Sequence, residues 1–242
     1  MVGPDDIIYE DEQLLALNKP ALLHSATLAR EGGPAVADFL ESYLPASEQI
    51  ALKPEDHGLV NRLDYETSGC LIAAKNRTAW EQLHHVLCSA SCHKEYLAIS
   101  HGIPPSDRNL EALLESRYRR SKKVRIVQGK DAATRAQLAK TKLEVIDQDK
   151  TRDIALVKLS PCTGVRHQLR VLMANGGYPL IGDKLYGSNI GLNSIAPDCP
   201  EHFVLHAYRY QLNLPTYGDV LRLCAPYPEY LRQLFPNSIS AL

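Results

Sequence analysis

The sequence predicts an α/β chain of the α+β type, built on a central, largely antiparallel sheet. Segments typical of strands outnumber segments typical of helices, and the connections between them are short. Hydrophobic residues make up 45% of the 242 residues and charged residues 23%, which is enough apolar material for a buried core. No Lys- or Pro-rich linker divides the chain, so we expect residues 1–242 to form a single domain.

Residues 1–91 are predicted to contain three strands and two helices. Residues 7–18 have the pattern of a strand, an acidic turn and a second strand. Residues 36–43 carry apolar side chains at helical spacing, and Pro45 follows as a stop signal. Residues 71–74 form an apolar run that predicts a buried strand. Residues 78–91 predict a helix whose inward-facing side chains are Trp80, Leu83, Val86 and Leu87.

After residue 91 the chain is predicted to add strands at residues 96–100, 138–146 and 154–159. The segment from Thr163 through Arg170 leads to Asn175-Gly176-Gly177 and looks like a helix with Asn or Gly at its end. On such a helix Arg166 and Arg170 are four residues apart and share one face.

The composition excludes several classes of protein. The 27 Lys and Arg residues balance 28 Asp and Glu residues, so the net charge of −1 indicates no partner by itself. The first twenty residues are acidic and lack the basic start and apolar centre of a signal peptide. No apolar run is long enough for a membrane-spanning helix, and the six cysteines are scattered. We therefore expect a cytoplasmic protein with reduced thiols and no membrane partner.

The segment Asn61-Arg62-Leu63-Asp64-Tyr65-Glu66-Thr67-Ser68-Gly69 places charged groups directly before an apolar run. If residues 62–64 are extended, Arg62 and Asp64 point to one side while Leu63 points to the other and anchors the loop. Such a loop would present a carboxylate on a fixed base. A lone R-x-D pattern is more often an exposed charged turn, so its interpretation depends on the wider pattern.

This segment resembles the H-R-L-D-R-x-T-S-G motif of the RluA-type family of RNA pseudouridine synthases. The resemblance covers about residues 7–228, and several motifs in the right order are more specific than any one of them. The other matching motifs are Lys19-Pro20, Lys94-Glu95-Tyr96, Gly129-Lys130-x-Ala132-x-Thr134, Thr163-Gly164 through Arg170, Gly182-Asp183-x-x-Tyr186-Gly187 and Leu205-His206-Ala207.

The resemblance implies a mixed, mainly antiparallel sheet with helices and loops around a central RNA-binding cleft. It also implies an enzyme that isomerises specific uridines of structured ribosomal or transfer RNA to pseudouridine. In that reaction Asp64 attacks the uridine, the glycosidic bond breaks, and the base rotates and reattaches through carbon; attack on the base or on the sugar stays open. The family needs no metal or cofactor. RNA is the expected partner, a monomer suffices, and no separate RNA-binding module is expected before residue 7.

Two further residues join Asp64 in the predicted catalytic set. By resemblance Arg170 pairs with the catalytic aspartate, and a nucleophilic carboxylate does require a nearby cation to stay ionised. By resemblance Tyr96 packs against the target base, as a flat aromatic wall for a uracil removed from its stack. Without the resemblance, Arg170 would be assigned to a solvated helix face and Tyr96 to the core.

Several cationic side chains are predicted to bind the RNA. Lys94 alternates with Tyr96 on a strand, so we expect both at the cleft. Arg62 would fill the space that the flipped base leaves, or grip a phosphate, and Arg166 joins this set beside Arg170. Residues 117–125 contain six basic side chains and no acidic one. Composition alone supports a solvated surface and a phosphate-binding surface equally. The RNA-modifying site that the resemblance implies favours phosphate binding, through Arg119, Arg120, Lys122 and Lys123.

The chain departs from the family pattern at a few positions. Asn61 stands where His is usual, Tyr65 where Arg is usual, and Val165-Arg166 where Arg-Thr is expected, while Leu172 replaces a common His. Tyr65 lacks a charge for a phosphate but can stack on a base. The departures therefore bear on substrate preference more than on chemistry.

Three other interpretations of the sequence are possible, and each makes a different demand on its residues. An RNA-binding or RNA-folding protein on the same fold, without turnover, would have no need of the Asp64 carboxylate. A carboxylate-dependent glycosidase needs a second carboxylate, for which Glu66 is the nearby candidate. His84, Cys88 and Cys92 are spaced along one helical stripe, but three ligands along one helix cannot converge on one ion. No metal site is therefore predicted.

Overall fold

The computed structural model describes residues 1–27, 33–44, 46, 49–116, 121–128, 135–188 and 190–240. Its contacts divide the chain into two compact units. Unit 1 comprises Met1–Lys94 and His206–Tyr227, and unit 2 comprises Glu95–Leu205 and Pro228–Leu242. Strand β4 (Cys92–His101) begins in unit 1 and continues in unit 2. None of the helices in the described ranges is long and apolar enough to cross a membrane.

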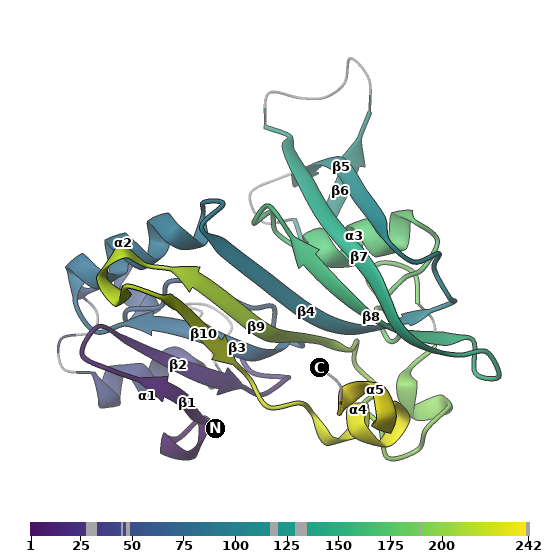
Figure 1. The fold of residues 1–242 in the computed structure, drawn as a ribbon, viewed down its shortest axis with the longest axis horizontal. Coiled ribbons are helices and arrows are strands. Elements are labelled where there is room, and N and C mark those ends of the chain that lie inside the picture. Colours follow the sequence, from purple (N-terminus) through teal and green to yellow (C-terminus); the bar gives the residue numbers. More distant parts are fainter. Residues whose placement is uncertain are drawn as a thin grey trace. The chain divides into compact units, whose positions relative to one another are not determined.

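Unit 1 is a mixed sheet with helices, and most of its strand pairs are antiparallel (Figure 1). The strands run in the order β1-β2-β3-β9-β10; β3 and β9 pair in parallel, and the other neighbouring strands in this order pair antiparallel. Their bounds are Ile7–Glu10, Leu14–Lys19, Ser68–Ala74, Leu205–Asn213 and Val220–Cys224. All seven residues of β3 are buried, which agrees with the apolar run predicted to be a strand.

The two helices of unit 1 follow their apolar periodicity. Helix α1 (Val36–Tyr43) has the predicted bounds, and α2 (Arg77–Leu87) buries the four predicted side chains. The Asn76 side chain caps α2 by accepting a hydrogen bond from Ala79 N at 2.9 Å. The helix ends four residues earlier than the predicted Ser91, because the Lys94 ammonium binds the terminal carbonyl of Leu87 at 2.6 Å.

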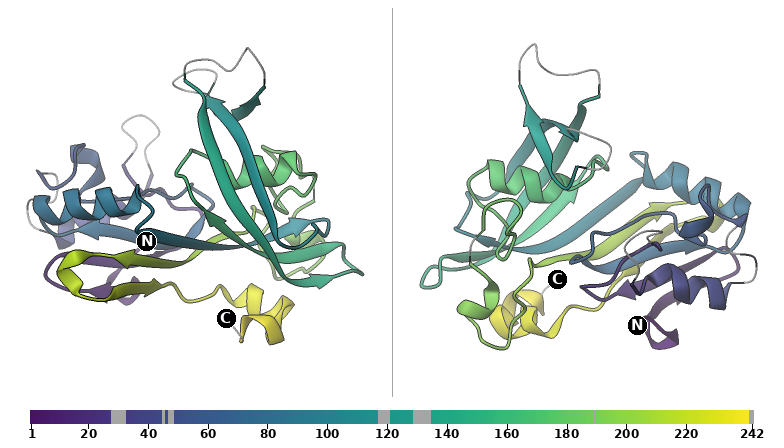
Figure 2. Two further views of the ribbon diagram at one scale, coloured as in Figure 1. Left: turned by 45° about the horizontal axis from the view of Figure 1, so that its top comes forward. Right: turned by 180° about the vertical axis from the view of Figure 1, so that it is seen from behind.

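Unit 2 contains an antiparallel sheet in the order β4-β8-β7-β5-β6 and the α-helices α3, α4 and α5. The four later strands are β8 (Ile154–Pro161), β7 (Gln137–Asp149), β5 (Arg108–Ser116) and β6 (Val124–Val127). Helix α3 (Gln168–Asn175) contacts β5, β6 and β7 and lies beside these strands in Figure 2. Helices α4 (Glu229–Leu234) and α5 (Pro236–Ile239) complete the unit. The predicted α+β class with a mixed, mainly antiparallel sheet is confirmed.

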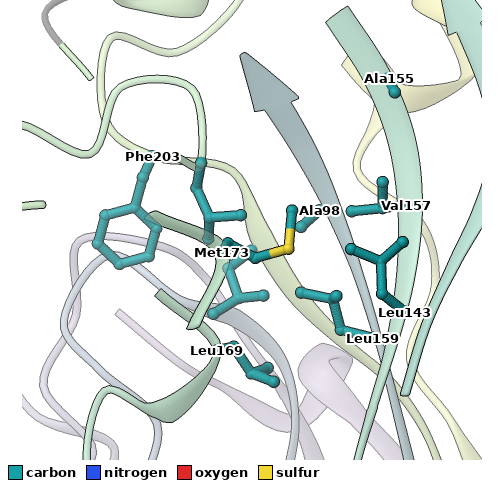
Figure 3. Close-up of a cluster of buried hydrophobic side chains, with 10 residues drawn as sticks. Ala98, Leu143, Ala155, Val157, Leu159, Leu169, Met173 and Phe203 are labelled. Carbon is teal, nitrogen blue, oxygen red and sulfur yellow. The ribbon is translucent and has the colours of Figure 1, made fainter. Parts of the chain in front are cut away.

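A buried apolar cluster fixes α3 on the sheet of unit 2. Ala98, Val157 and Leu159 project from the strands, and Leu169 and Met173 project from α3 toward them (Figure 3). Burial of such side chains is the main favourable term in folding. Tyr96, partly buried, packs against the same cluster. The helix that carries Arg170 and the strand that carries Tyr96 therefore share one core.

The predicted shared face of Arg166 and Arg170 is wrong. Helix α3 begins only at Gln168, and His167 before it has a left-handed backbone with φ 55°. The Gln168 Oε1 atom accepts hydrogen bonds from Thr163 Oγ1 at 2.7 Å and Val165 N at 3.1 Å. These bonds hold the preceding segment as a loop. Arg166 is therefore exposed on that loop, whereas Arg170 is buried in the helix.

Candidate active site

Asp64 lies in the loop that leads into β3. The neighbouring Leu63 is buried, while Arg62 is exposed and Asp64 is half-buried, so the predicted alternation is present. The Ser25 hydroxyl clamps Leu63 on both sides: Leu63 N donates to Ser25 Oγ and Ser25 Oγ donates to Leu63 O, each at 2.9 Å. Thr67 N donates to Asp64 O at 3.0 Å and closes the turn. The carboxylate therefore stands on a fixed backbone.

Asn61 secures the start of the same loop. Its Oδ1 atom accepts a hydrogen bond from Ile72 N at 2.8 Å, and its Nδ2 atom donates to the Tyr210 hydroxyl at 3.2 Å. The side chain thus joins the loop to β3 and β9. Asn61 therefore stabilises the loop through two hydrogen bonds, at a position where the family usually has His.

Lys19, at the end of β2, is a buried cation beneath the Asp64 loop. Its side chain is fully buried, and its ammonium donates to Leu23 O at 2.7 Å, Pro20 O at 2.9 Å and Tyr65 O at 3.3 Å. Burial lowers the pKa of Lys19 to about 7, and the negative charge of Asp64 opposes this shift. Sequence reasoning matched Lys19 to a motif but assigned it no role. The sequence signal that could have indicated a role for Lys19 is its position as a charged residue at the end of an otherwise largely apolar strand.

The Thr-Ser-Gly turn and the Leu-His-Ala motif meet where β3 and β9 pair in parallel. Ser68 lies opposite His206, with Ser68 Oγ and His206 Nδ1 2.9 Å apart. Gly69 has φ +105°, and a Cβ atom there would lie 2.4 Å from Ala207 O. Only glycine permits this approach. Two motifs that are far apart in the sequence thus support the end of the Asp64 loop.

Buried His206 makes the stability of the fold sensitive to acid. Burial lowers the pKa of His206 from its ordinary 6.5 to about 4, and the backbone of Ala225 opposes this shift only in part. The unfolded chain binds the proton more tightly. The stabilisation is therefore complete above pH 6.5 and is lost as the pH falls toward 4, by about 3 kcal/mol in total.

We expect urea denaturation to reveal this loss between about pH 7 and about pH 4. Over that range the free energy of unfolding of wild type should fall by about 2–3 kcal/mol more than that of His206→Gln, which cannot bind the proton. Equal losses in the two proteins would show that His206 titrates normally in the folded state.

Two predicted RNA-binding cations of unit 1 have partners within the protein. The Arg62 guanidinium pairs with Asp56, with 2.9 Å between Nε and Oδ1, and is 46% exposed. The Lys94 ammonium binds Leu87 O at the end of α2, as described above. Contact of either side chain with RNA stays a prediction.

Arg170 in unit 2 is held in a buried, bidentate ion pair. Its Nε and Nη2 atoms donate to the two carboxylate oxygens of Asp183 at 2.7 and 2.9 Å. The guanidinium carbon lies 4.1 Å from the centre of the Phe203 ring and 5.1 Å from that of Tyr186. Gly182 permits the turn, since a Cβ atom there would lie 2.7 Å from His202 O. Sequence reasoning missed Asp183 as a partner, although its Gly-Asp motif had been matched.

The loop before α3 holds part of the basic run. Arg166 Nη1 donates to Ser121 O at 2.7 Å and Nη2 donates to Lys122 O at 3.5 Å. The Tyr186 hydroxyl accepts a hydrogen bond from Val124 N at 2.9 Å, which holds the other end of residues 121–124. Lys122 and Lys123 are exposed. Arg119 and Arg120 lie outside the described residues, as does the motif at residues 129–134.

The histidine and cysteine side chains that were considered as metal ligands lie on α2, at its C-cap and at the start of β4. The His84 ring stacks on Trp80 with centroids 4.8 Å apart, and Cys88 Sγ lies 4.0 Å from His84 Nε2. Cys92 is buried, which raises the pKa of its thiol to about 11. In the part of the chain that the structure describes, no three His, Cys, Asp or Glu side chains form a group that could hold a metal ion.

Comparison with known protein families gives a consistent result. The family model described as RNA pseudouridylate synthase matches residues 13–175. The chain is 31% identical over 227 residues to ribosomal large subunit pseudouridine synthase C of Rickettsia prowazekii (strain Madrid E), covering 93% of this chain and 69% of that protein. It is 32% identical over 245 residues to the protein of the same name in Escherichia coli (strain K12), covering 95% and 68%.

A solved structure agrees with these relatives. The chain is similar to human RNA pseudouridylate synthase domain containing 4, with a TM-score of 0.70 and 25% identity. The match covers 95% of this chain and 93% of the human chain. A second human structure, RNA pseudouridylate synthase domain containing 1, has the same fold, with a TM-score of 0.71 at 24% identity and coverage of 98% and 89%.

Proposed function

The chain belongs to the RluA-type family of RNA pseudouridine synthases, and we propose that it isomerises uridines of structured RNA with Asp64 as its catalytic carboxylate. The fixed presentation of Asp64 carries this assignment. The residue before Asp64, Leu63, is hydrogen-bonded to the Ser25 hydroxyl through its backbone N and O atoms. The backbone carbonyl of the residue after it, Tyr65, accepts a hydrogen bond from buried Lys19. A carboxylate held in this way is preorganised for attack on a positioned substrate.

The chemistry requires an ionised carboxylate and no redox partner. The bond from ribose C1′ to uracil N1 breaks, a bond from C1′ to C5 forms, a proton leaves C5 and a proton arrives at N1. Atoms and electrons therefore balance within the substrate. Asp64 must be ionised whether it attacks the ribose or the uracil ring. We propose no metal or cofactor for this isomerisation.

Arg170 and Tyr96 complete the proposed catalytic set. Arg170 would pair with Asp64 during the reaction, and its bidentate bond to Asp183 supports this role because it holds the guanidinium in one orientation. Tyr96 would stack on the target uracil, and its packing on the cluster that holds α3 supports a rigid aromatic wall. Arg62, Lys94 and Arg166 remain proposed RNA contacts.

The basic run at residues 117–125 is the proposed phosphate-binding segment. We expect the combined change of Arg119, Arg120, Lys122 and Lys123 to Ala to weaken RNA binding. The slope of the logarithm of the RNA-binding constant against the logarithm of the salt concentration should become shallower by about 3. Each lost phosphate contact reduces the number of counterions that binding releases. Fluorescence anisotropy with labelled RNA between about 50 and 200 mM salt measures this slope.

A matched control uses two cations at the turn between β7 and β8. Lys150 and Arg152 are exposed there, and their joint change to Ala should leave the slope as in wild type. The change of Lys122 and Lys123 alone should reduce the slope by about half as much as the four changes together. An unchanged slope in the fourfold variant would reject the segment as an RNA contact.

We further propose that the two units form one catalytic domain that acts as a monomer in the cytoplasm. Ribosomal RNA is the favoured substrate over transfer RNA, because the curated relatives are named for the large ribosomal subunit. Several departures from the family pattern, such as Tyr65, lie next to Asp64 in the sequence. We expect these residues to influence which uridine the enzyme modifies.

Incubation of RNA from cells that lack this protein tests the proposal. Ribosomal and transfer RNA are treated separately with wild type and with Asp64→Ala, and pseudouridine is then mapped. New pseudouridine in ribosomal RNA with wild type alone is the expected result. Tight binding without pseudouridine would favour an RNA-binding protein on the same fold. Release of free uracil would favour a glycosidase that uses Glu66.

A further inference from the structure

Exposed apolar and aromatic groups lie beside the Asp64 loop in unit 1. The Tyr65 side chain follows Asp64 directly and is 46% exposed. The His24 ring packs on it with centroids 4.6 Å apart and planes tilted by 39°. Leu22, two residues before His24, is 50% exposed. We call these three residues the Leu22–His24–Tyr65 platform.

The platform shares its anchors with the catalytic carboxylate. Lys19 binds the carbonyls of Pro20 and Leu23, on either side of Leu22, and also the carbonyl of Tyr65. Leu23 N donates to the same Tyr65 carbonyl at 3.2 Å. One buried ammonium thus ties the turn that carries Leu22 to the loop that carries Asp64. The platform is therefore fixed relative to the proposed nucleophile.

Leu22 occupies this turn at a conformational cost. Its φ of 61° is in the left-handed region, where a side chain with a Cβ atom is strained and glycine is not. Half of the Leu22 side chain faces solvent, so packing within the chain recovers little of that cost. Strained residues of this kind gather at ligand-contacting sites. A contact between Leu22 and a bound molecule would account for a leucine at this position.

We propose that the platform binds the nucleobase of a nucleotide next to the target uridine by stacking and apolar contact. The inference rests on the proposed function and specifies how that site recognises its RNA. Turning a uridine out of its stack deprives its neighbours of a stacking partner, and an aromatic side chain supplies a replacement face for any base. Tyr65 is uncharged, so this contact recognises a base face and not a phosphate.

The kinetic test uses a synthetic RNA that carries the uridine mapped with wild type. Tyr65→Ala should raise KM about tenfold and leave kcat within about twofold, while Tyr65→Phe should match wild type, because the ring alone stacks. Tyr43→Ala is the matched control, since Tyr43 is also an exposed tyrosine stacked on a neighbouring ring, that of Phe39. An abasic nucleotide at the recognised flanking position should raise the KM of wild type equally and should not raise that of Tyr65→Ala further.

A direct binding test does not depend on turnover. In Asp64→Asn, the fluorescence of 2-aminopurine at the flanking position of the RNA should be quenched on binding, and the quenching should disappear in Asp64→Asn combined with Tyr65→Ala.

Leu22→Gly should unfold at the same or a higher temperature than wild type, because it relieves backbone strain, and yet should raise KM.

The outcomes separate this inference from the proposed function. If wild type forms pseudouridine and Tyr65→Ala behaves like Tyr43→Ala, the platform does not bind a base and the inference fails. If wild type forms no pseudouridine, the proposed function fails, and the quenching measurement on mixed RNA oligonucleotides still decides whether the platform stacks on bases.

Discussion

Replacing Asp64 with Asn is expected to lower kcat for pseudouridine formation by about 10⁴-fold or more, with RNA affinity within about threefold of wild type. An amide has nearly the shape of a carboxylate but lacks its negative charge and nucleophilicity. The loop should keep its conformation, because Leu63 is held by Ser25 and the turn is closed through the Asp64 backbone carbonyl. The loss should therefore appear in the chemical step.

Single-turnover assays and binding isotherms on the same RNA separate the two quantities. The matched control is Glu66→Gln, which neutralises the carboxylate two residues along the same loop and should change kcat by less than about fivefold if Glu66 takes no part in the chemistry. If Glu66→Gln lost turnover and Asp64→Asn kept it, the nucleophile would be Glu66 and the assignment to Asp64 would be wrong.

Replacing Asp183 with Asn is expected to produce the largest loss of stability. Arg170 would lose the carboxylate that accepts two of its hydrogen bonds, and breaking a buried ion pair by removing one partner costs about 3–5 kcal/mol. The guanidinium would also lose its fixed orientation, so kcat should fall by about 10²-fold at temperatures where the variant is folded. Urea denaturation and single-turnover kinetics measure the two effects.

A double variant distinguishes the two consequences. Arg170→Met with Asp183→Leu removes both charges, so it should regain most of the lost free energy of unfolding while remaining inactive. The exposed pair of Lys184 and Glu201 provides the control, and Glu201→Gln should cost less than about 1 kcal/mol. If Asp183→Asn were as mild as Glu201→Gln, the ion pair would not be what holds Arg170.

Local sequence signals predicted several elements because local interactions control them. Helix α1 has its predicted bounds, since its apolar residues recur at helical spacing and Pro45 follows. Leu63 is the predicted anchor of the Asp64 loop, because an extended backbone turns alternate side chains to opposite sides. The apolar run predicted to be a buried strand, residues 71–74, lies within β3, whose residues are all buried.

Other features depend on partners that are distant in the sequence. Helix α3 begins at Gln168 and not near Thr163 because the Gln168 side chain also donates to Lys140 O at 2.8 Å, on strand β7. The end of α2 depends on Lys94, which reaches back to the last helical carbonyl. The strands β5, β6, β9 and β10 were not predicted, since their pairing is set by neighbouring strands more than by their own periodicity.

The sequence by itself determined the family of this protein, its α+β class and the identity of the candidate carboxylate, because ordered motifs and apolar periodicity are written in consecutive residues. Only the tertiary structure decided which charges support the site. Lys19 lies beneath the Asp64 loop, and Asp183 holds Arg170, because a buried ion needs partners that only folding brings within bonding distance.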